Sequence, residues 1–270
     1  MRSRHRLPDP CILSFSLIGG LIVGLTVLAL LNMAVKEISD IPFLIATASD
    51  SGVINAIAVT MGAGLNAVII LLIIGTPLAY VLARTDFRWK GVVEGLVDIP
   101  IMLPHTVAGI LVYLLFMRRG LLGAPLYEMG FSFEDAYPGI VIAMLFVSAP
   151  YFVNSVREGF EKVPVHLENV ARTLGATRFQ TFMRVVLPLS VRHIFNGSIL
   201  AWGRAIGEFA AIIMIAYYPF VISTLIYYTF TTRGIKTSST VAFVMILACF
   251  AAFIILRLLT RYTGRYDDRV

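Results

Sequence analysis

Long, uninterrupted apolar stretches constrain this chain more than any other feature. Several exceed the roughly 18 residues that distinguish a membrane-spanning helix from a buried helix of a soluble core. Only 14% of the 270 residues are charged, whereas a soluble domain contains about a quarter. We therefore predict an all-α integral membrane protein, a single domain over residues 1–270. Six transmembrane helices are expected at about 12–35, 55–83, 96–117, 138–156, 188–216 and 240–258.

The distribution of Lys and Arg predicts how these spans are oriented. With the N-terminus inside, sixteen basic residues fall on the cytoplasmic side and five outside, as the positive-inside rule requires. Both termini, including residues 1–11, are then cytoplasmic, and the protein is a multi-pass component of a prokaryotic plasma membrane, with the lipid bilayer as its surroundings. The net charge of +6 follows from this topology and requires no nucleic-acid partner.

The expected fifth span contains two deep ionisable residues, Arg204 and Glu208. Their spacing of four residues places them on one face of a continuous helix. Ionisable residues within a span face protein or a cavity and are functional candidates by default. We predict a gate or a pathway lining here; the alternative is a buried ion pair that only fixes how the span packs.

Two other regions are candidates for the transport path. In the third span, Pro100 and Pro104 are followed by His105 and Thr106, which predicts a kinked helix. This helix either lines the transport path or has an ordinary kink without a role in transport. The outer loops 120–138 and 217–240 are rich in aromatic residues. The second contains an apolar stretch, 220–230, too short to cross the membrane. These loops form either an outer gate or an interfacial aromatic belt.

The longest cytoplasmic stretch contains an amphipathic segment, residues 164–187. Pro164 suits the start of a helix, and apolar residues follow it at helical spacing. Gly175 is placed to end that helix with a positive φ. A second helical stretch, 177–186, then returns to the membrane, where Pro188 is expected to stop it. A helix of this kind can rest on lipid headgroups or dock a protein.

The order of residues in this segment resembles the signature of binding-protein-dependent ABC importer permeases. That signature consists of EAA, three residues, Gly, nine residues, Ile, one residue and Leu-Pro. Gly175 takes the glycine position and Val185 the isoleucine position, while Leu187 and Pro188 end the motif. The first triplet departs from the pattern, since it reads Asn-Val-Ala and the acidic residue, Glu168, stands one position earlier.

The resemblance implies a coupling helix that docks on a separate ATPase. The residues it assigns to this contact are Glu168, Asn169, Ala171, Arg172, Leu174, Gly175 and Ala176, with Glu168 as the acidic contact. It further implies a pair of permease chains, two copies of a cytoplasmic ABC ATPase and an external oxyanion-binding protein. The stretches 98–109 and 203–211 are most similar to archaeal-type molybdate/tungstate permeases, and transport by alternating access follows.

The sequence lacks the motifs of a motor or an enzyme. It contains no G-x-x-x-x-G-K-[ST] phosphate cradle, and its four histidines have no metal-ligand spacing. ATP and Mg²⁺ are therefore expected on the partner, with no cofactor and no metal on this chain. An ion-coupled secondary transporter is the alternative, but it predicts charges near the membrane midplane in two related halves. A third alternative, an intramembrane hydrolase, needs a Ser/His pair or paired carboxylates at membrane depth, and the sequence shows neither arrangement.

Overall fold

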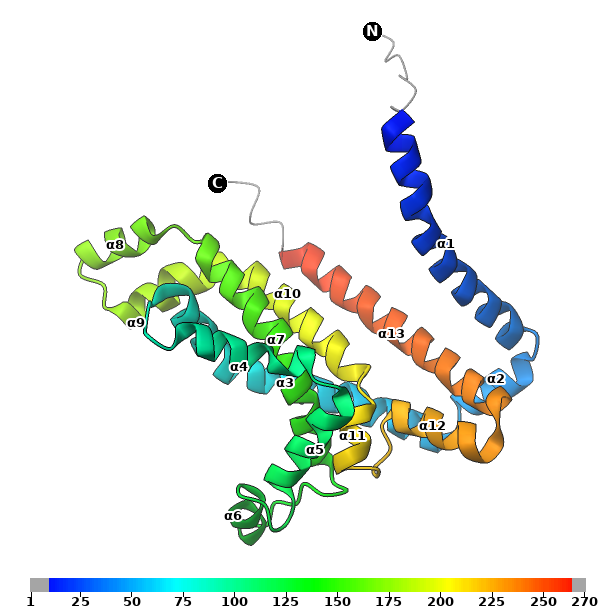
Figure 1. Ribbon diagram of the computed structural model, residues 1–270. Coiled ribbons are helices and arrows are strands. Elements are labelled where there is room, and N and C mark those ends of the chain that lie inside the picture. The colour runs from blue at the N-terminus through cyan, green and yellow to red at the C-terminus, as the bar shows by residue number, and fades with distance from the viewer. Residues whose placement is uncertain (1–9, 264–270) are drawn as a thin grey trace. The chain divides into compact units, whose positions relative to one another are not determined.

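The computed structural model describes residues 10–263, which form helices joined by turns, with no strand in that range. The chain divides into two compact units, one from residues 1–54 and 226–270 and the other from residues 55–225. The helices, labelled in Figure 1, are α1 (Pro10–Ile38), α2 (Ile41–Ala48), α3 (Ser51–Arg84), α4 (Lys90–Met102), α5 (His105–Phe116), α6 (Gly123–Glu128), α7 (Tyr137–Lys162), α8 (Val165–Thr173), α9 (Arg178–Thr181), the π-helical turn η1 (Phe182–Val186), α10 (Leu187–Ile206), α11 (Ala210–Ile215), α12 (Ile222–Arg233) and α13 (Ile235–Thr263).

Polar contacts hold the first unit together. Glu37 of α1 is buried, and its two carboxylate oxygens accept hydrogen bonds from Ser239 (2.7 Å) and Thr240 (2.6 Å) of α13. Lys236 donates to Asp40, which precedes α2, at 2.7 Å. Because buried polar groups are costly unless they are paired, the bonds of Glu37 fix α1 against the start of α13. The exposed Lys236–Asp40 pair adds a contact between α13 and the residue before α2.

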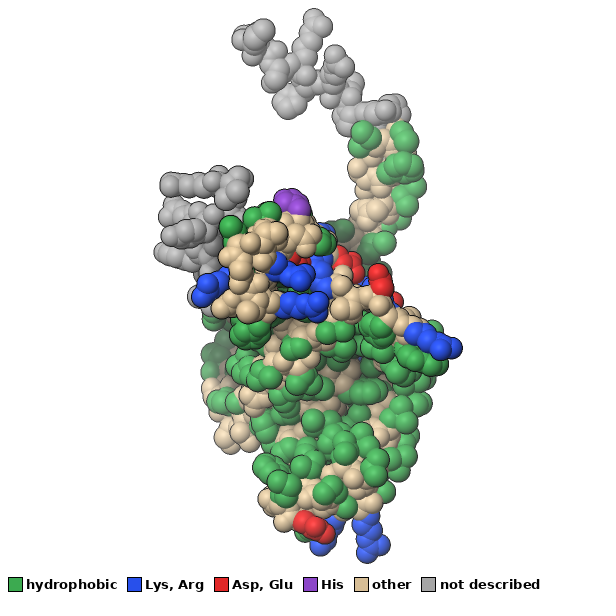
Figure 2. Space-filling model, turned by 90° about the vertical axis from the view of Figure 1, so that its left-hand side faces the viewer, with side chains coloured by type: hydrophobic (Ala, Val, Ile, Leu, Met, Phe, Trp, Pro, Cys, Tyr) green, Lys and Arg blue, Asp and Glu red, His purple; other side chains and the backbone are tan. Residues whose placement is uncertain are grey.

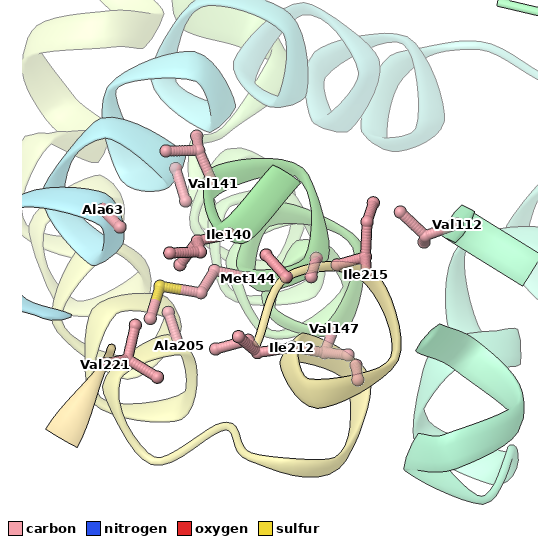
Figure 3. Close-up of a cluster of buried hydrophobic side chains, with 14 of the residues drawn as sticks. Ala63, Val112, Ile140, Val141, Met144, Val147, Ala205, Ile212, Ile215 and Val221 are labelled. Atoms are coloured by element: carbon pink, nitrogen blue, oxygen red, sulfur yellow. The ribbon is translucent and has the colours of Figure 1, made fainter. Parts of the chain in front are cut away.

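The second unit is built around α7, which packs along α10 (Figure 1). Figure 3 shows the apolar cluster at its centre, where Ile140 and Met144 of α7 lie near Ala205 of α10 and Ile212 of α11, and Val112 of α5 lies beside Ile215. The small side chain of Ala205 lets α10 approach α7 closely. This cluster therefore fixes the relative positions of α5, α7, α10 and α11.

Five helices within the described residues are long and apolar enough to cross a membrane: Ser14–Ile38, Ser51–Arg84, Tyr137–Lys162, Arg178–Ile206 and Ile235–Ile255. A sixth span exists if α4 and α5, which are bent by 115° at Pro104, are taken as one broken span. The expected kink in the third span is thus a full break. Since the proline cannot donate to the α4 carbonyls, the helix is interrupted there and restarts at His105.

The continuous helix expected over 188–216 is wrong, because α10 ends at Ile206 and α11 begins at Ala210. Between them, the backbone carbonyl of Glu208 accepts a hydrogen bond from the Ser223 hydroxyl (2.7 Å), and its side-chain Oε1 accepts from the Ala211 N–H (2.8 Å). The carboxylate thus supplies a partner for an N–H in the first turn of α11, which helix starts require. These contacts replace the helical hydrogen bonds lost at the break.

Candidate functional site

The cytoplasmic segment forms the predicted helix, turn and second helix. Pro164 caps the N-terminus of α8, which runs from Val165 to Thr173. Gly175 follows with φ +91°, a conformation that glycine adopts without steric cost. Thr177 then caps α9 through a reciprocal pair of hydrogen bonds with Gln180. The segment therefore has a defined shape at both ends of its turn.

Glu168 ties α8 to the end of α3. It is 8% exposed, and its Oε1 accepts from Arg84 Nε at 2.6 Å while Oε2 accepts from the Tyr80 hydroxyl at 3.2 Å. Arg84 also donates through Nη2 to the Val163 carbonyl at 2.8 Å. The Glu168 carboxylate is thus paired within the chain and holds α8 against α3, and its acidic contact with an ATPase stays a prediction.

The face of α8 and α9 that points away from Glu168 is open. Leu174 is 83% exposed, and the apolar side chains of Val170 and Phe179 in the same two helices are also exposed. Figure 2 shows basic side chains gathered at this end of the second unit. Two shallow depressions lie on it, of about 580 Å³ and 340 Å³. They are lined by Asn169, Arg172, Thr173, Ala176, Thr177 and Arg178, and by Ala171, Leu174, Gly175, Ala176, Gln180, Thr181, Arg184 and Val185.

The end of the motif does not stop the second helix. The residues from Arg178 to Ile206 are helical throughout, and Leu187 and Pro188 lie at the start of α10. The expected stop at Pro188 is wrong because the preceding turn, η1, is π-helical, so that the Leu187 N–H reaches the Phe182 carbonyl five residues back. This wider turn lets the helix pass through a residue that has no N–H to donate.

Aromatic side chains join this turn to the spans. The ring of Phe182 in η1 lies 4.7 Å from that of Tyr80 in α3 and 5.9 Å from that of Phe160 in α7. The sequence-based interpretation missed Tyr80 as a contact of the segment and treated Arg84 only as a topological charge. Both are more than 80 positions from Glu168, so no local pattern connects them to it.

The pathway candidates come together in part. Arg204 Nη2 lies 2.6 Å from Glu208 Oε2, so the expected pairing forms although the helix between them is interrupted. The same nitrogen lies 3.0 and 2.9 Å from the two ring nitrogens of His105, which begins α5. Pro104 and Thr106 flank His105 and are exposed. The break in the third span and the break in the fifth therefore meet at one cluster.

The two aromatic outer loops also lie together. The Asp135 carboxylate accepts a hydrogen bond from the Tyr217 N–H at 2.9 Å, and its own N–H donates to the Ile215 carbonyl at 3.1 Å. The apolar stretch 220–230 of the second loop overlaps α12, which begins at Ile222. Whether these loops gate the path or lie at the membrane interface stays a prediction.

Comparison with known proteins identifies the family. Residues 75–265 match the family model described as "Binding-protein-dependent transport system inner membrane component". The chain belongs to this family. The resemblance inferred from the motif at Gly175 is therefore confirmed, and the protein is a permease component of a transport system and not an enzyme in itself.

Curated relatives cover nearly the whole chain. It is 39% identical over 243 residues to the molybdate/tungstate transport system permease protein of Thermococcus kodakarensis, covering 90% of this chain and 93% of that protein. It is 40% identical over 216 residues to the protein of the same description from Methanocaldococcus jannaschii, covering 80% and 85% of the two chains. The molybdenum transport system permease protein of Escherichia coli is 36% identical over 160 residues, which cover 59% of this chain and 70% of that protein.

Solved structures share the fold. A bacterial ABC transporter involved in the import of the acidic polysaccharide alginate matches with a TM-score of 0.70 at 18% identity, covering 94% of this chain and 96% of that one. The inward-facing MetNI methionine ABC transporter matches with a TM-score of 0.56 at 21% identity, covering 77% and 94%. The helical arrangement is thus that of ABC importer membrane subunits.

Proposed function

We propose that this chain is the membrane-spanning permease subunit of an ATP-driven importer that carries a tetrahedral oxyanion, molybdate or tungstate, into the cell by alternating access. The observation that carries the proposal is the 39% identity, over 90% of the chain, to a permease described by that substrate pair. No observation favours the ion-coupled secondary transporter.

The arrangement of the second unit supports an orientation. The helices α8 and α6 lie at opposite ends of that unit (Figure 1), and the basic residues gather at the α8 end (Figure 2). Because cytoplasmic loops carry the excess of Lys and Arg, we assign α8 to the cytoplasm, and the count of basic residues along the sequence assigns both termini there as well. The loops that meet at Asp135 then face the external binding protein.

In the functional assembly, two copies of the chain pair and each docks one ABC ATPase, which holds the ATP and Mg²⁺. The exposed face of α8 is the docking surface, with Leu174 seated in a hydrophobic groove of the ATPase and Arg172 and Arg178 beside its acidic groups. The buried pair of Glu168 and Arg84 holds α8 against α3 and the end of α7. Movement of the ATPase is thereby transferred to the spans.

The test is reconstitution of the chain with its ATPase and binding protein in liposomes, followed by uptake of labelled molybdate. We expect uptake only with ATP. Leu174→Asp should abolish co-purification with the ATPase by burying a charge in an apolar contact. Gly175→Pro should do the same, because proline fixes φ near −65° where the turn has +91°.

The matched control for the docking surface is Leu121→Asp, since Leu121 is as exposed as Leu174 but belongs to the loop before α6. This variant should still co-purify with the ATPase. Uptake by the wild type without ATP would contradict the proposed function, and normal co-purification of Leu174→Asp would contradict the assigned docking surface.

A further inference from the structure

Two interrupted helices touch backbone to backbone beside the Arg204 cluster. A Cβ added to Gly109 of α5 would lie 2.6 Å from the Ala211 carbonyl oxygen of α11. The residues that follow Arg204 and Ala211 in the chain, Ala205 and Ile212, belong to the apolar cluster of Figure 3. This close packing therefore fixes the two helix breaks, which carry His105 and Glu208, relative to each other.

The charges at this meeting point differ in exposure. The Glu208 side chain is 2% exposed, Arg204 is 19% exposed and His105 is 42% exposed. The cluster thus has an acidic group at its base and basic groups toward its opening. An anion that approaches from the open side meets His105 and Arg204 before it meets Glu208.

The guanidinium of Arg204 has N–H donors that are not used within the cluster. Only its Nη2 contacts Glu208 and His105, while Nε and Nη1 make no hydrogen bond among the described residues. A guanidinium presents five N–H donors in a planar fork that suits the oxygens of a tetrahedral oxyanion.

Glu208 is held so that it can release Arg204 and stay in place. Its Oε1 accepts from the Ala211 N–H at 2.8 Å, while Oε2 alone faces Arg204 at 2.6 Å. If Arg204 turned toward another anion, the carboxylate would keep its bond to the α11 backbone. Arg204 can therefore exchange Glu208 for another anion, while the backbone N–H of Ala211 keeps Glu208 in place.

We propose that Arg204 and His105 contact the transported dianion directly, and that Glu208 is a built-in counter-anion that occupies Arg204 whenever the dianion is absent. This inference rests on the proposed function and names residues of its path. Two basic groups without a competitor would hold a dianion too long, whereas a transport site must be favourable enough to enter and weak enough to leave. Competition by Glu208 provides the weakening.

The experiment measures binding of labelled tungstate by equilibrium dialysis to the purified permease–ATPase complex without the binding protein. Glu208→Gln removes the competing charge but leaves an amide oxygen for the Ala211 N–H. We expect Glu208→Gln to bind tungstate, at one site per permease chain, about tenfold more tightly than the wild type, which corresponds to ~1.4 kcal/mol. The gain should disappear in Glu208→Gln/Arg204→Met and persist in the matched control Glu208→Gln/Arg233→Met.

An unchanged tungstate affinity of Glu208→Gln, or a gain that survives Arg204→Met, would overturn the inference and leave the pair as a packing element. If Glu208→Gln does not assemble with the ATPase, Glu208→Asp shortens the carboxylate and should give a smaller gain with the same dependence on Arg204. Wild-type uptake in liposomes is a separate measurement. ATP-dependent uptake without the binding gain refutes only this inference, whereas absence of ATP-dependent uptake refutes the proposed function.

Discussion

The Arg84–Glu168 pair should contribute a measurable coupling energy to the attachment of α8. Both side chains are 11% exposed, and Arg84 Nε lies 2.6 Å from Glu168 Oε1. Removing one partner of a buried ion pair costs about 3–5 kcal/mol, because the other charge is left uncompensated. Since some water still reaches this pair, we expect the lower end, about 3 kcal/mol, for Arg84→Met.

Removing both charges should cost less than removing one. In Arg84→Met/Glu168→Gln the uncompensated charge is gone, and the new amide still accepts a hydrogen bond from the Tyr80 hydroxyl, which lies 3.2 Å from the wild-type carboxylate. Neutral replacement of both partners of a buried pair is often nearly free of cost. We therefore expect the double variant to recover about 2 kcal/mol of the loss caused by Arg84→Met.

The assay is a double-mutant cycle of the free energy of unfolding, measured for the wild type, the two single variants and the double variant in mixed micelles. A second measurement, oxyanion transported per ATP hydrolysed, should fall in Arg84→Met, because α8 is no longer held at a fixed angle to α3. If the two single losses add to the loss of the double variant within about 0.5 kcal/mol, the pair does not couple and the reasoning is refuted.

Three further predictions concern other contacts. Gly109→Val should separate α5 from α11 and lower the free energy of unfolding by roughly 1–3 kcal/mol; an unchanged value would show that the helices adjust freely. Thr60→Val removes the acceptor 2.8 Å from the Ile222 N–H and should cost about 1–3 kcal/mol, with faster hydrogen exchange at that amide; unchanged exchange would contradict this. The hydrogen bond from Lys236 lowers the pKa of Asp40. The contribution of this bond to the attachment of α2 to α13 should therefore be complete above the unfolded-state pKa, near 3.8, and be lost as the pH falls through the lower folded-state pKa. Asp40→Asn should abolish this pH dependence of amide exchange in α2.

Local signals predicted the cytoplasmic segment well. Pro164 and Gly175 each impose a backbone conformation that depends on the residue itself, so a helix start and a positive φ could be predicted without knowledge of the fold. Four of the six apolar runs, 12–35, 55–83, 138–156 and 240–258, likewise predicted helices and lie within α1, α3, α7 and α13. The bend at Pro104 was expected in kind, although its size of 115° depends on how α5 packs against α11.

Tertiary contacts account for what the sequence could not predict. A glycine such as Gly207 is tolerated within many helices, so it did not indicate that α10 ends there. The break depends on Ser223, which donates to the Glu208 carbonyl from fifteen residues away. The inward direction of Glu168 likewise depends on Arg84, and nothing near the motif signals that this carboxylate is already paired.

The π-helical turn η1 has a consequence for the direction in which α8 projects. A π-turn accommodates one more residue than the α-helical turn it replaces, and one residue of an α-helix corresponds to a rotation of about 100° and a rise of 1.5 Å. Because η1 fits its extra residue into a single turn, deleting one residue between Phe182 and Val186 should restore a regular helix and leave the direction of α9 and the preceding turn unchanged. Deleting one residue in the regular part of α10 should instead rotate them by about 100° around the helix axis. At this one turn, the direction of the proposed docking surface is therefore insensitive to the loss of one residue, whatever the chemistry of that surface.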